Sequence, residues 1–346
     1  MLVPPTPGEG VNALSNYPGA NAAVMALACA DWTGDAARGA QALEVLRDTT
    51  RVSLSGQQWR EDLGGYIDGR MPNVVQQEAA IYGLRESLAR GVADAGWEVM
   101  SGKVLRPMAA LEGREVVVAG FGAEPLTGYG DAPWLIGLWW YGNLGTDDAS
   151  ARATYDMVKQ SNTWKYVFNG GWMGVQAARL GLGDDALNWA KGMLQPGVTH
   201  FDDACFGEIV FGPEDFKKTP EIGAHGALIC NITQVLLDGD SEETIRVFPA
   251  LPSAWRTETV AFEGLAARGA VRVSGGWGSD GVRVRLENGG TVPCTRQLVV
   301  DLPPGISEMT AGPADVTLRD GQAVLPRLEL TPGQTTALVF ARGPRE

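Results

Sequence analysis

The hydrophobic periodicity of the chain changes from helical to strand-like between Ile222 and Trp255. Residues 222–237 carry aliphatic side chains at helical spacing and no carboxylate, lysine or arginine, which predicts a helix buried on most of its circumference. We expect the turn at 238–240 to stop this helix, with Gly239 supplying the open backbone conformation that a helix C-terminus prefers. From residue 243 apolar and polar side chains alternate, and this change of period indicates a domain boundary.

The regions on either side of this change differ in the elements that they predict. The first region predicts helices at 18–30, 36–48 with Asp35 as its cap, 72–90, 131–141 and 222–237. Only one run in it is strand-like, at 115–119. After the change, short alternating runs separated by turns predict an antiparallel β-sandwich of about 100 residues. We therefore expect a helical domain over residues 1–240 and a β-sandwich domain over residues 241–346.

A similar phrase occurs three times in the helical region. A small-residue turn, an Asp and then an apolar helix follow one another at 31–46, 142–158 and 181–194. Three loose copies of one phrase predict stacked helical hairpins.

Composition limits the kind of partner. The net charge of −13 and the lack of basic runs argue against nucleic acid or an anionic membrane surface. Four scattered cysteines and two histidines predict neither a disulfide framework nor a metal site, and no phosphate-binding glycine loop is present, so we expect no cofactor. No apolar run reaches the ~20 residues that span a bilayer, and the N-terminus lacks a secretory pattern. These features do not identify a compartment.

The end of the helical region carries a phrase that resembles a known family. Residues 245–255, Ile245-RVFPALPSA-Trp255, are followed by Phe262-EGLAARGAVR-Val273 and by Trp277. This series resembles the junction and C-terminal β-domain of six-hairpin glycosidases, and is most similar to glycoside hydrolase family 95, the inverting α-L-fucosidases. The resemblance covers residues 222–277. It implies an (α/α)6 barrel followed by a β-sandwich, and hydrolysis of glycosides with inversion.

Two departures from that family concern the barrel. The fucosidases carry an Asp in an I-D-G-N phrase before the last barrel helix, whereas Ile222-Gly223-Ala224-His225 has none and Glu221 is the nearest carboxylate. Twelve barrel helices need about 250–400 residues at typical lengths, and we count about nine helices before residue 240. Either the barrel is incomplete, as in a fragment or one part of a split enzyme, or some short helices leave no pattern.

Inverting hydrolysis requires an acid and a base on opposite faces of a sugar, about 6.5–9.5 Å apart. Residues 199–226 are irregular and interleave carboxylates with phenylalanines, as a catalytic loop does, although a solvated acidic loop has the same composition. Glu208 lies between apolar residues, where burial favours a protonated acid. We therefore expect Glu208 and Glu221 to be the catalytic pair, while Glu221 also fits a residue that only stabilises a helix start.

Further residues are candidates for substrate contact because they combine polar groups with aromatic rings. They are Trp59, Glu78, Asp131, Trp134, Trp172 and His225. Each also has a structural interpretation: a tryptophan anchor, a helix cap at Asp131, or a core histidine at His225.

Three functions remain open at this level. We favour a glycoside hydrolase that acts on an oligo- or polysaccharide, with carbohydrate as its partner. The alternatives are a noncatalytic carbohydrate-binding protein or partner subunit of a split glycosidase, in which another chain completes the barrel, and a polysaccharide lyase. Strands before residue 200, or the lack of a cleft floored by residues 199–226, would count against sugar chemistry.

Overall fold

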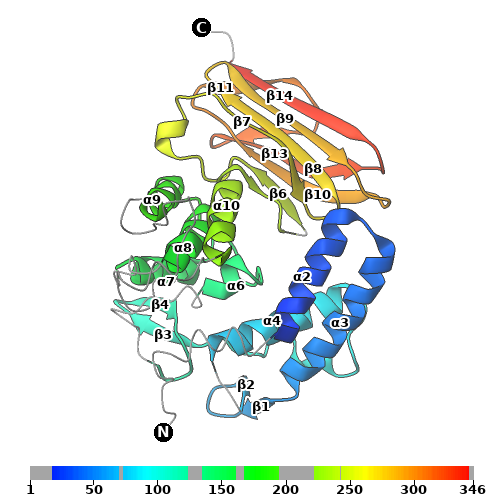
Figure 1. Ribbon diagram of the computed structural model, residues 1–346, viewed down its shortest axis with the longest axis vertical. Helices are drawn as coiled ribbons and strands as arrows, with labels where there is room; N and C mark the ends of the chain where they lie inside the picture. The colour runs from blue at the N-terminus through cyan, green and yellow to red at the C-terminus, as the bar shows by residue number, and fades with distance from the viewer. Residues whose placement is uncertain are drawn as a thin grey trace.

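The computed structural model describes residues 18–69, 73–123, 135–160, 167–194, 222–241 and 243–342. Helices occupy the first part of the chain, and two mainly antiparallel sheets occupy the last part (Figure 1). This order of a helical region followed by a β region is the one that the sequence predicts.

The described helices are α2 (Pro18–Thr33), α3 (Ala36–Leu54), α4 (Val74–Ala89), α5 (Trp97–Met100), α6 (Ile136–Trp139), α7 (Ala149–Gln160), α8 (Val167–Arg179), α9 (Gly183–Met193) and α10 (Ile222–Leu236). Side-chain caps start α3, α4 and α7, the last through Asp148, which accepts the N–H groups of Ser150 and Ala151. The Asp35 carboxylate accepts the N–H groups of Ala37 and Arg38, so the predicted cap of α3 is confirmed. Asn73 caps α4 in the same way by accepting the N–H of Gln76.

Four helices form a row that we call the central row. α4 packs on α6, α6 on α8, and α8 on α10, while α3, α5, α7 and α9 pack against members of this row. Glycines allow the close approach, because a Cβ on Gly137 would overlap Glu78 and one on Gly174 would overlap Asn231. In Figure 1, α2 and α10 stand apart, so the described helices form an arc.

Two short hairpins interrupt the helical region. β1 (Gln57–Arg60) pairs with β2 (Gly65–Asp68), and β3 (Met108–Leu111) pairs with β4 (Arg114–Val117). The expectation of a single strand-like run before residue 200 is therefore wrong. Strands before residue 200 were to count against sugar chemistry, and these two hairpins are such strands. These hairpins connect helices and form no layer of their own, so the helices alone form the framework of this region.

The β-domain contains β5 (Leu237–Asp238), β6 (Thr244–Val247), β7 (Val260–Ala267), β8 (Val271–Gly278), β9 (Gly281–Asn288), β10 (Cys294–Asp301), β11 (Ile306–Ala311), β12 (Thr317–Arg319), β13 (Gln322–Leu330) and β14 (Thr335–Arg342). Its two sheets have the orders β12-β13-β10-β6-β5 and β11-β14-β9-β8-β7. One pairing, β6 with β10, is parallel, and the others are antiparallel. Buried side chains of both sheets belong to one hydrophobic cluster, as the alternating pattern predicts.

The phrase at 245–255 forms the joint between the two regions. The Phe248 ring packs edge-on against Phe262 and Trp277, with ring centroids 5.5 and 5.7 Å apart. Ala250 and Leu251 are buried, and their backbone lies directly against Gly183 at the start of α9. The residues that carry the family resemblance therefore have a structural role here.

The end of α10 differs from the prediction in its detail. The helix ends at Leu236 and runs without a loop into β5, which pairs with β6. Gly239 does not adopt a left-handed conformation, so the predicted reason for this glycine is wrong. A Cβ at Gly239 would instead lie 2.6 Å from that of Ala267, and the glycine is needed because β7 passes close to the backbone there.

Candidate functional site

The carboxyl-terminal ends of α2, α8 and α10 face the β-domain. At the end of α2, the carbonyl oxygen of Asp31 accepts the N–H of Ala270 at 2.7 Å. In the first turn of α9, shortly after the end of α8, the Asp184 carboxylate accepts the Ser253 N–H at 2.7 Å and the Ser253 hydroxyl at 2.6 Å. The end of α10 continues directly into β5. The amino-terminal ends of these helices therefore point away from the β-domain, as Figure 1 shows for α2.

Predicted site residues precede these amino-terminal ends in the chain. Asp131 and Trp134 come shortly before α6, and Glu208 and Glu221 come before α10. All four lie outside the described residues, as does most of the segment 199–226, so their placement stays a prediction. An amino-terminal helix end carries partial positive charge and unpaired N–H groups, which favour a carboxylate or an oxygen-rich ligand beside α10.

Glu78 lies in the second turn of α4 and is fully buried. Arg106 forms an ion pair with its carboxylate, and the Asn143 amide donates a hydrogen bond of 2.8 Å to Oε2. The carboxylate is therefore held rigidly between the α4 and α6 segments. A contact between Glu78 and substrate is not tested by this geometry and stays a prediction.

Trp59 lies on β1, in the hairpin that leads into the start of α4. Its side chain is 42% exposed, and its ring packs edge-on against Tyr66 at 5.2 Å. Gln77 of α4 fixes the hairpin, because its carboxamide accepts the Asp68 N–H and donates to the carbonyl oxygens of Tyr66 and Leu105. Trp59 is thus an exposed ring on a well-anchored support at the end of the molecule away from the β-domain.

Trp172 and His225 lie on neighbouring helices of the central row. Trp172 is half-buried in the second turn of α8. His225 is in the first turn of α10, and its side chain is outside the described part of the structure. The two helices meet closely here, because a Cβ on Gly171 would lie 2.5 Å from that of Ala227. α8 and α10 therefore bring these two sequence positions to one region.

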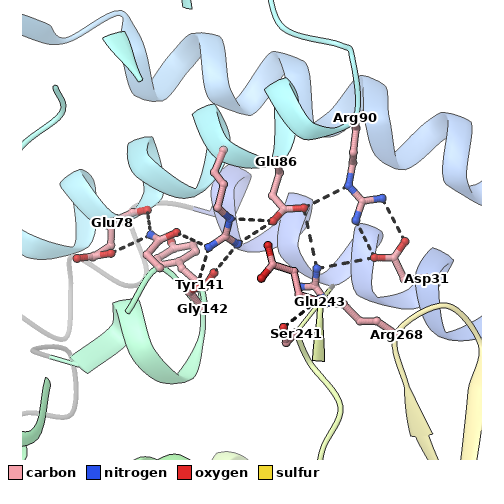
Figure 2. A network of polar contacts seen from close by, with 11 residues as sticks. Asp31, Glu78, Glu86, Arg90, Tyr141, Gly142, Ser241, Glu243 and Arg268 are labelled. Carbon is pink, nitrogen blue, oxygen red and sulfur yellow. Dashed lines mark hydrogen bonds and ion pairs between the residues drawn. The ribbon is translucent and has the colours of Figure 1, made fainter. Parts of the chain in front are cut away.

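A network of charged groups, which the sequence does not predict, joins α4 to the β-domain (Figure 2). The buried Glu86 carboxylate contacts Arg85 at 2.7 Å, Arg90 at 3.2 Å and Arg268 at 3.9 Å. Arg90 also pairs with Asp31 of α2 at 2.8 Å. Burial alone would raise the pKa of Glu86, but the three guanidinium groups outweigh it and hold that pKa below its ordinary value.

Arg85 and Asn143 continue this network along α4. Arg85 donates to the Asn143 side chain at 3.1 Å, and Asn143 in turn donates to Glu78. A continuous series of polar contacts therefore runs from Glu78, in the second turn of α4, to Arg268 in the β-domain. No local pattern in the sequence identifies it, because its members come from residues 31–268.

The described residues contain no group of three or more His, Cys, Asp or Glu side chains that could hold a metal ion. None of the described helices is long and apolar enough to cross a membrane. Of the described cysteines, Cys29 and Cys230 are exposed and Cys294 is buried, and all three are free thiols.

Comparison with known proteins gives a likeness in fold. No protein-family model and no curated protein sequence matches the chain. An α-L-rhamnosidase from Streptomyces avermitilis, solved with L-rhamnose, is 14% identical with a TM-score of 0.51, over 90% of this chain and 32% of that one. A candidate kojibiose phosphorylase from the human microbiome is 10% identical with a TM-score of 0.46, over 85% and 43% of the two chains.

A third similar structure is Ara127N-Se, a GH127 β-L-arabinofuranosidase from Geobacillus stearothermophilus T6. It is 12% identical with a TM-score of 0.26, over 78% of this chain and 42% of that one. The chain spans less than half the length of each of these proteins. Identity this low shows the fold alone. The helical region and its trailing sheets have a fold similar to part of the rhamnosidase, while a place in family 95 stays a prediction.

Proposed function

We propose that the protein hydrolyses glycosidic bonds at the amino-terminal end of the central row. The observation that carries this proposal is the common orientation of α2, α8 and α10: their carboxyl-terminal ends meet the β-domain, and α10 starts directly after Glu221 at the other end. The fold likeness to the rhamnosidase supports it. Exposed Trp59 and the segments before α6 and α10 supply the rings and carboxyl groups that sugar hydrolysis needs.

The proposed chemistry uses Glu208 as the acid and Glu221 as the base. Glu208 gives its proton to the glycosidic oxygen as the bond from that oxygen to the anomeric carbon breaks. Glu221 takes a proton from a water molecule, whose oxygen attacks the anomeric carbon from the opposite face and inverts it. The partial positive charge at the start of α10 favours the ionised form of Glu221, which a base requires.

The test is hydrolysis of a panel of aryl glycosides by the full chain and by Glu208→Gln and Glu221→Gln. We expect the wild-type protein to release the aryl group from at least one glycoside, with inversion observed by NMR of the first product. Each variant should lose activity by about 10²–10⁴-fold, the usual contribution of a general acid or base. Glu44→Gln, an exposed change on α3, is the control. Variants that stay fully active would refute the catalytic pair.

A second candidate is a partner subunit, in which another chain completes the arc of helices. The observation in its favour is that both ends of the arc expose apolar side chains: Met25 of α2 is 62% exposed and Ile229 of α10 is 66% exposed. α2 packs on α3, and α10 packs on α8 and α9, so these side chains lie on the remaining faces of their helices. An exposed apolar patch on such a face is typical of an association surface. Mass measurement in solution, for wild type and for Ile229→Lys, tests association of copies of this chain. A larger species that Ile229→Lys dissociates would support it.

A further inference from the structure

The outer face of the sheet formed by β7, β8, β9 and β14 is hollowed. The hollow has a volume of about 590 Å³, and its lining includes Ala261, Glu263, Ser274, Gly276, Arg283 and Arg285. Side chains on this face alternate with the buried side chains Val273, Val282, Val284 and Leu338 beneath the sheet. Figure 1 shows the β-domain at the end of the molecule opposite to β1 and β2, so the hollow is separate from the proposed reaction site.

Gly276 forms part of the floor, and neither packing nor backbone conformation requires a glycine there. A Cβ at this position would have no atom within 4 Å, and the residue has no left-handed φ. Its neighbour Gly275 differs, because a Cβ on Gly275 would lie 2.5 Å from the Phe262 ring. A glycine inside a strand weakens the strand, and such a glycine often marks a bulge or the close approach of a ligand or another chain.

Two arginines of β9, Arg283 and Arg285, lie opposite small residues on the neighbouring strands. Arg283 lies opposite Gly276 on β8 and Val339 on β14, and Arg285 lies opposite Ser274 and Ala337. Arg285 forms a 3.1 Å ion pair with Glu287, and Arg283 pairs with no carboxylate of the described residues. In a chain of net charge −13, this face therefore offers a local site for an anionic group.

The opposite wall of the hollow supplies groups of another kind. A β-bulge between Phe262 and Leu265 sets the direction of Glu263, since the bulge breaks the register of β7 on β8. Ser274 accepts the Gly264 N–H at 3.1 Å, which leaves its own O–H free to donate. A carboxylate and a hydroxyl beside two guanidinium groups match a ligand that carries both an anionic group and hydroxyl groups.

We propose that this hollow binds an acidic saccharide, one that carries a uronate carboxylate. Arg283 and Arg285 bind the carboxylate, because a guanidinium group matches its geometry with two parallel hydrogen bonds. Glu263 accepts hydrogen bonds from sugar hydroxyls, and the sugar ring lies over Gly276. A simple inorganic anion fits less well, since it would leave the floor empty and would face the Glu263 carboxylate.

The choice of a saccharide rests on the proposed function, whereas the hollow and its charges do not. Such a site would hold an acidic polysaccharide on the β-domain while a different part of the same polymer reaches the helical end. Its binding can be measured without turnover, so failure of hydrolysis and failure of this proposal give different results.

The experiment is isothermal titration of the full-length Glu208→Gln protein with trigalacturonate, with neutral galactotriose and with sodium sulfate. We expect trigalacturonate to bind, and the other two probes to bind at least tenfold more weakly. In the Glu208→Gln protein, adding either Arg283→Gln or Gly276→Leu should weaken trigalacturonate binding at least tenfold. The leucine fills the hollow without any change of charge, and open space at this position allows the protein to fold.

Arg327→Gln is the matched control, because it removes one positive charge from an exposed strand position in the other sheet. It should leave the affinity unchanged. Equal binding of galactotriose would overturn the acidic class, and equal binding of sulfate would reduce the hollow to an adventitious anion site. Absence of binding, or affinity that both Gly276→Leu and Arg283→Gln leave unchanged, would overturn the site itself.

Discussion

The Glu86 carboxylate of α4 lies 3.9 Å from the Arg268 guanidinium, which follows β7 at the edge of the β-domain. Asp31 of α2 lies at the same distance from Arg268. Only 3% of the Glu86 side chain and 10% of the Arg268 side chain are exposed. Arg268 therefore joins α2 and α4 to the β-domain by ion pairs with Asp31 and Glu86.

Glu86→Gln tests how much this connection stabilises the fold. The change leaves Arg85, Arg90 and Arg268 without their shared carboxylate, and loss of one partner of a buried ion pair costs about 3 kcal/mol. We expect the unfolding free energy, measured with urea, to fall by about that amount. Glu44→Gln on the surface of α3 should change it by less than about 0.5 kcal/mol. Equal effects of the two changes would show that the cluster adds no stability.

The same carboxylate predicts a pH dependence of stability. The pKa of Glu86 is lower in the folded protein than in the unfolded chain, so the folded state binds fewer protons in that interval. Its contribution is complete above the unfolded value of about 4.3 and is lost as the pH falls towards the folded pKa. Urea unfolding below about pH 4.3 should therefore weaken the wild type more steeply than Glu86→Gln. Parallel pH profiles would contradict this assignment.

A pair of glycine changes tests the close packing of the central row. Gly174→Ala places a methyl group on the Asn231 amide, which donates a 3.0 Å hydrogen bond to the Ala186 carbonyl oxygen. We expect a loss of about 1–3 kcal/mol from overpacking. Gly39→Ala in α3 meets no atom within 4 Å and should add about 0.4–1 kcal/mol. Thermal unfolding separates the two, and a stabilising Gly174→Ala would show that α8 and α10 are loosely packed.

Two adjacent glycines in β8 should respond to alanine in opposite directions. Gly276→Ala is expected to raise the unfolding free energy by about 0.5–1 kcal/mol, because glycine inside a strand is unfavourable and the position is open. Gly275→Ala should lower it by about 1–3 kcal/mol, since the methyl group would meet the Phe262 ring. A destabilising Gly276→Ala would indicate a structural need for this glycine and weaken the case for a ligand.

Trp59→Ala tests the exposed ring on β1. If the ring stacks on substrate, its loss should raise KM about fivefold, which corresponds to about 1 kcal/mol of lost contact, and leave kcat nearly constant. Trp59→Phe should restore most of the affinity. Because the side chain is 42% exposed, the melting temperature should change little. An unchanged KM would show that Trp59 has no part in substrate binding.

The long elements could be predicted from the sequence because their periodicity is local. The pattern at 72–90 predicts a helix, and α4 spans Val74–Ala89. The strands after residue 243 follow the alternation that predicts them. β1 could not be found in this way, because Gln57–Arg60 is polar at every position except Trp59 and the hairpin depends on Gln77 from α4.

The candidate site was less predictable than the fold. Glu78 is a predicted residue, but its partners Arg106 and Asn143 come from distant segments without a shared motif. The same holds for Asp31, Glu86 and Arg268, which only the tertiary fold brings together. Glu208, Glu221, Asp131 and Trp134 lie outside the described residues, so the geometry of the proposed chemistry stays a prediction.

The direct passage from α10 into β5 affects how the chain can be divided. β5 covers one side of β6 by backbone pairing, although it precedes the boundary that the sequence suggests at residue 241. A shortened protein that began at residue 241 would leave β6 as an open edge with bare N–H and C=O groups. Such an isolated C-terminal half would tend to aggregate, and a soluble version should start upstream of Leu237.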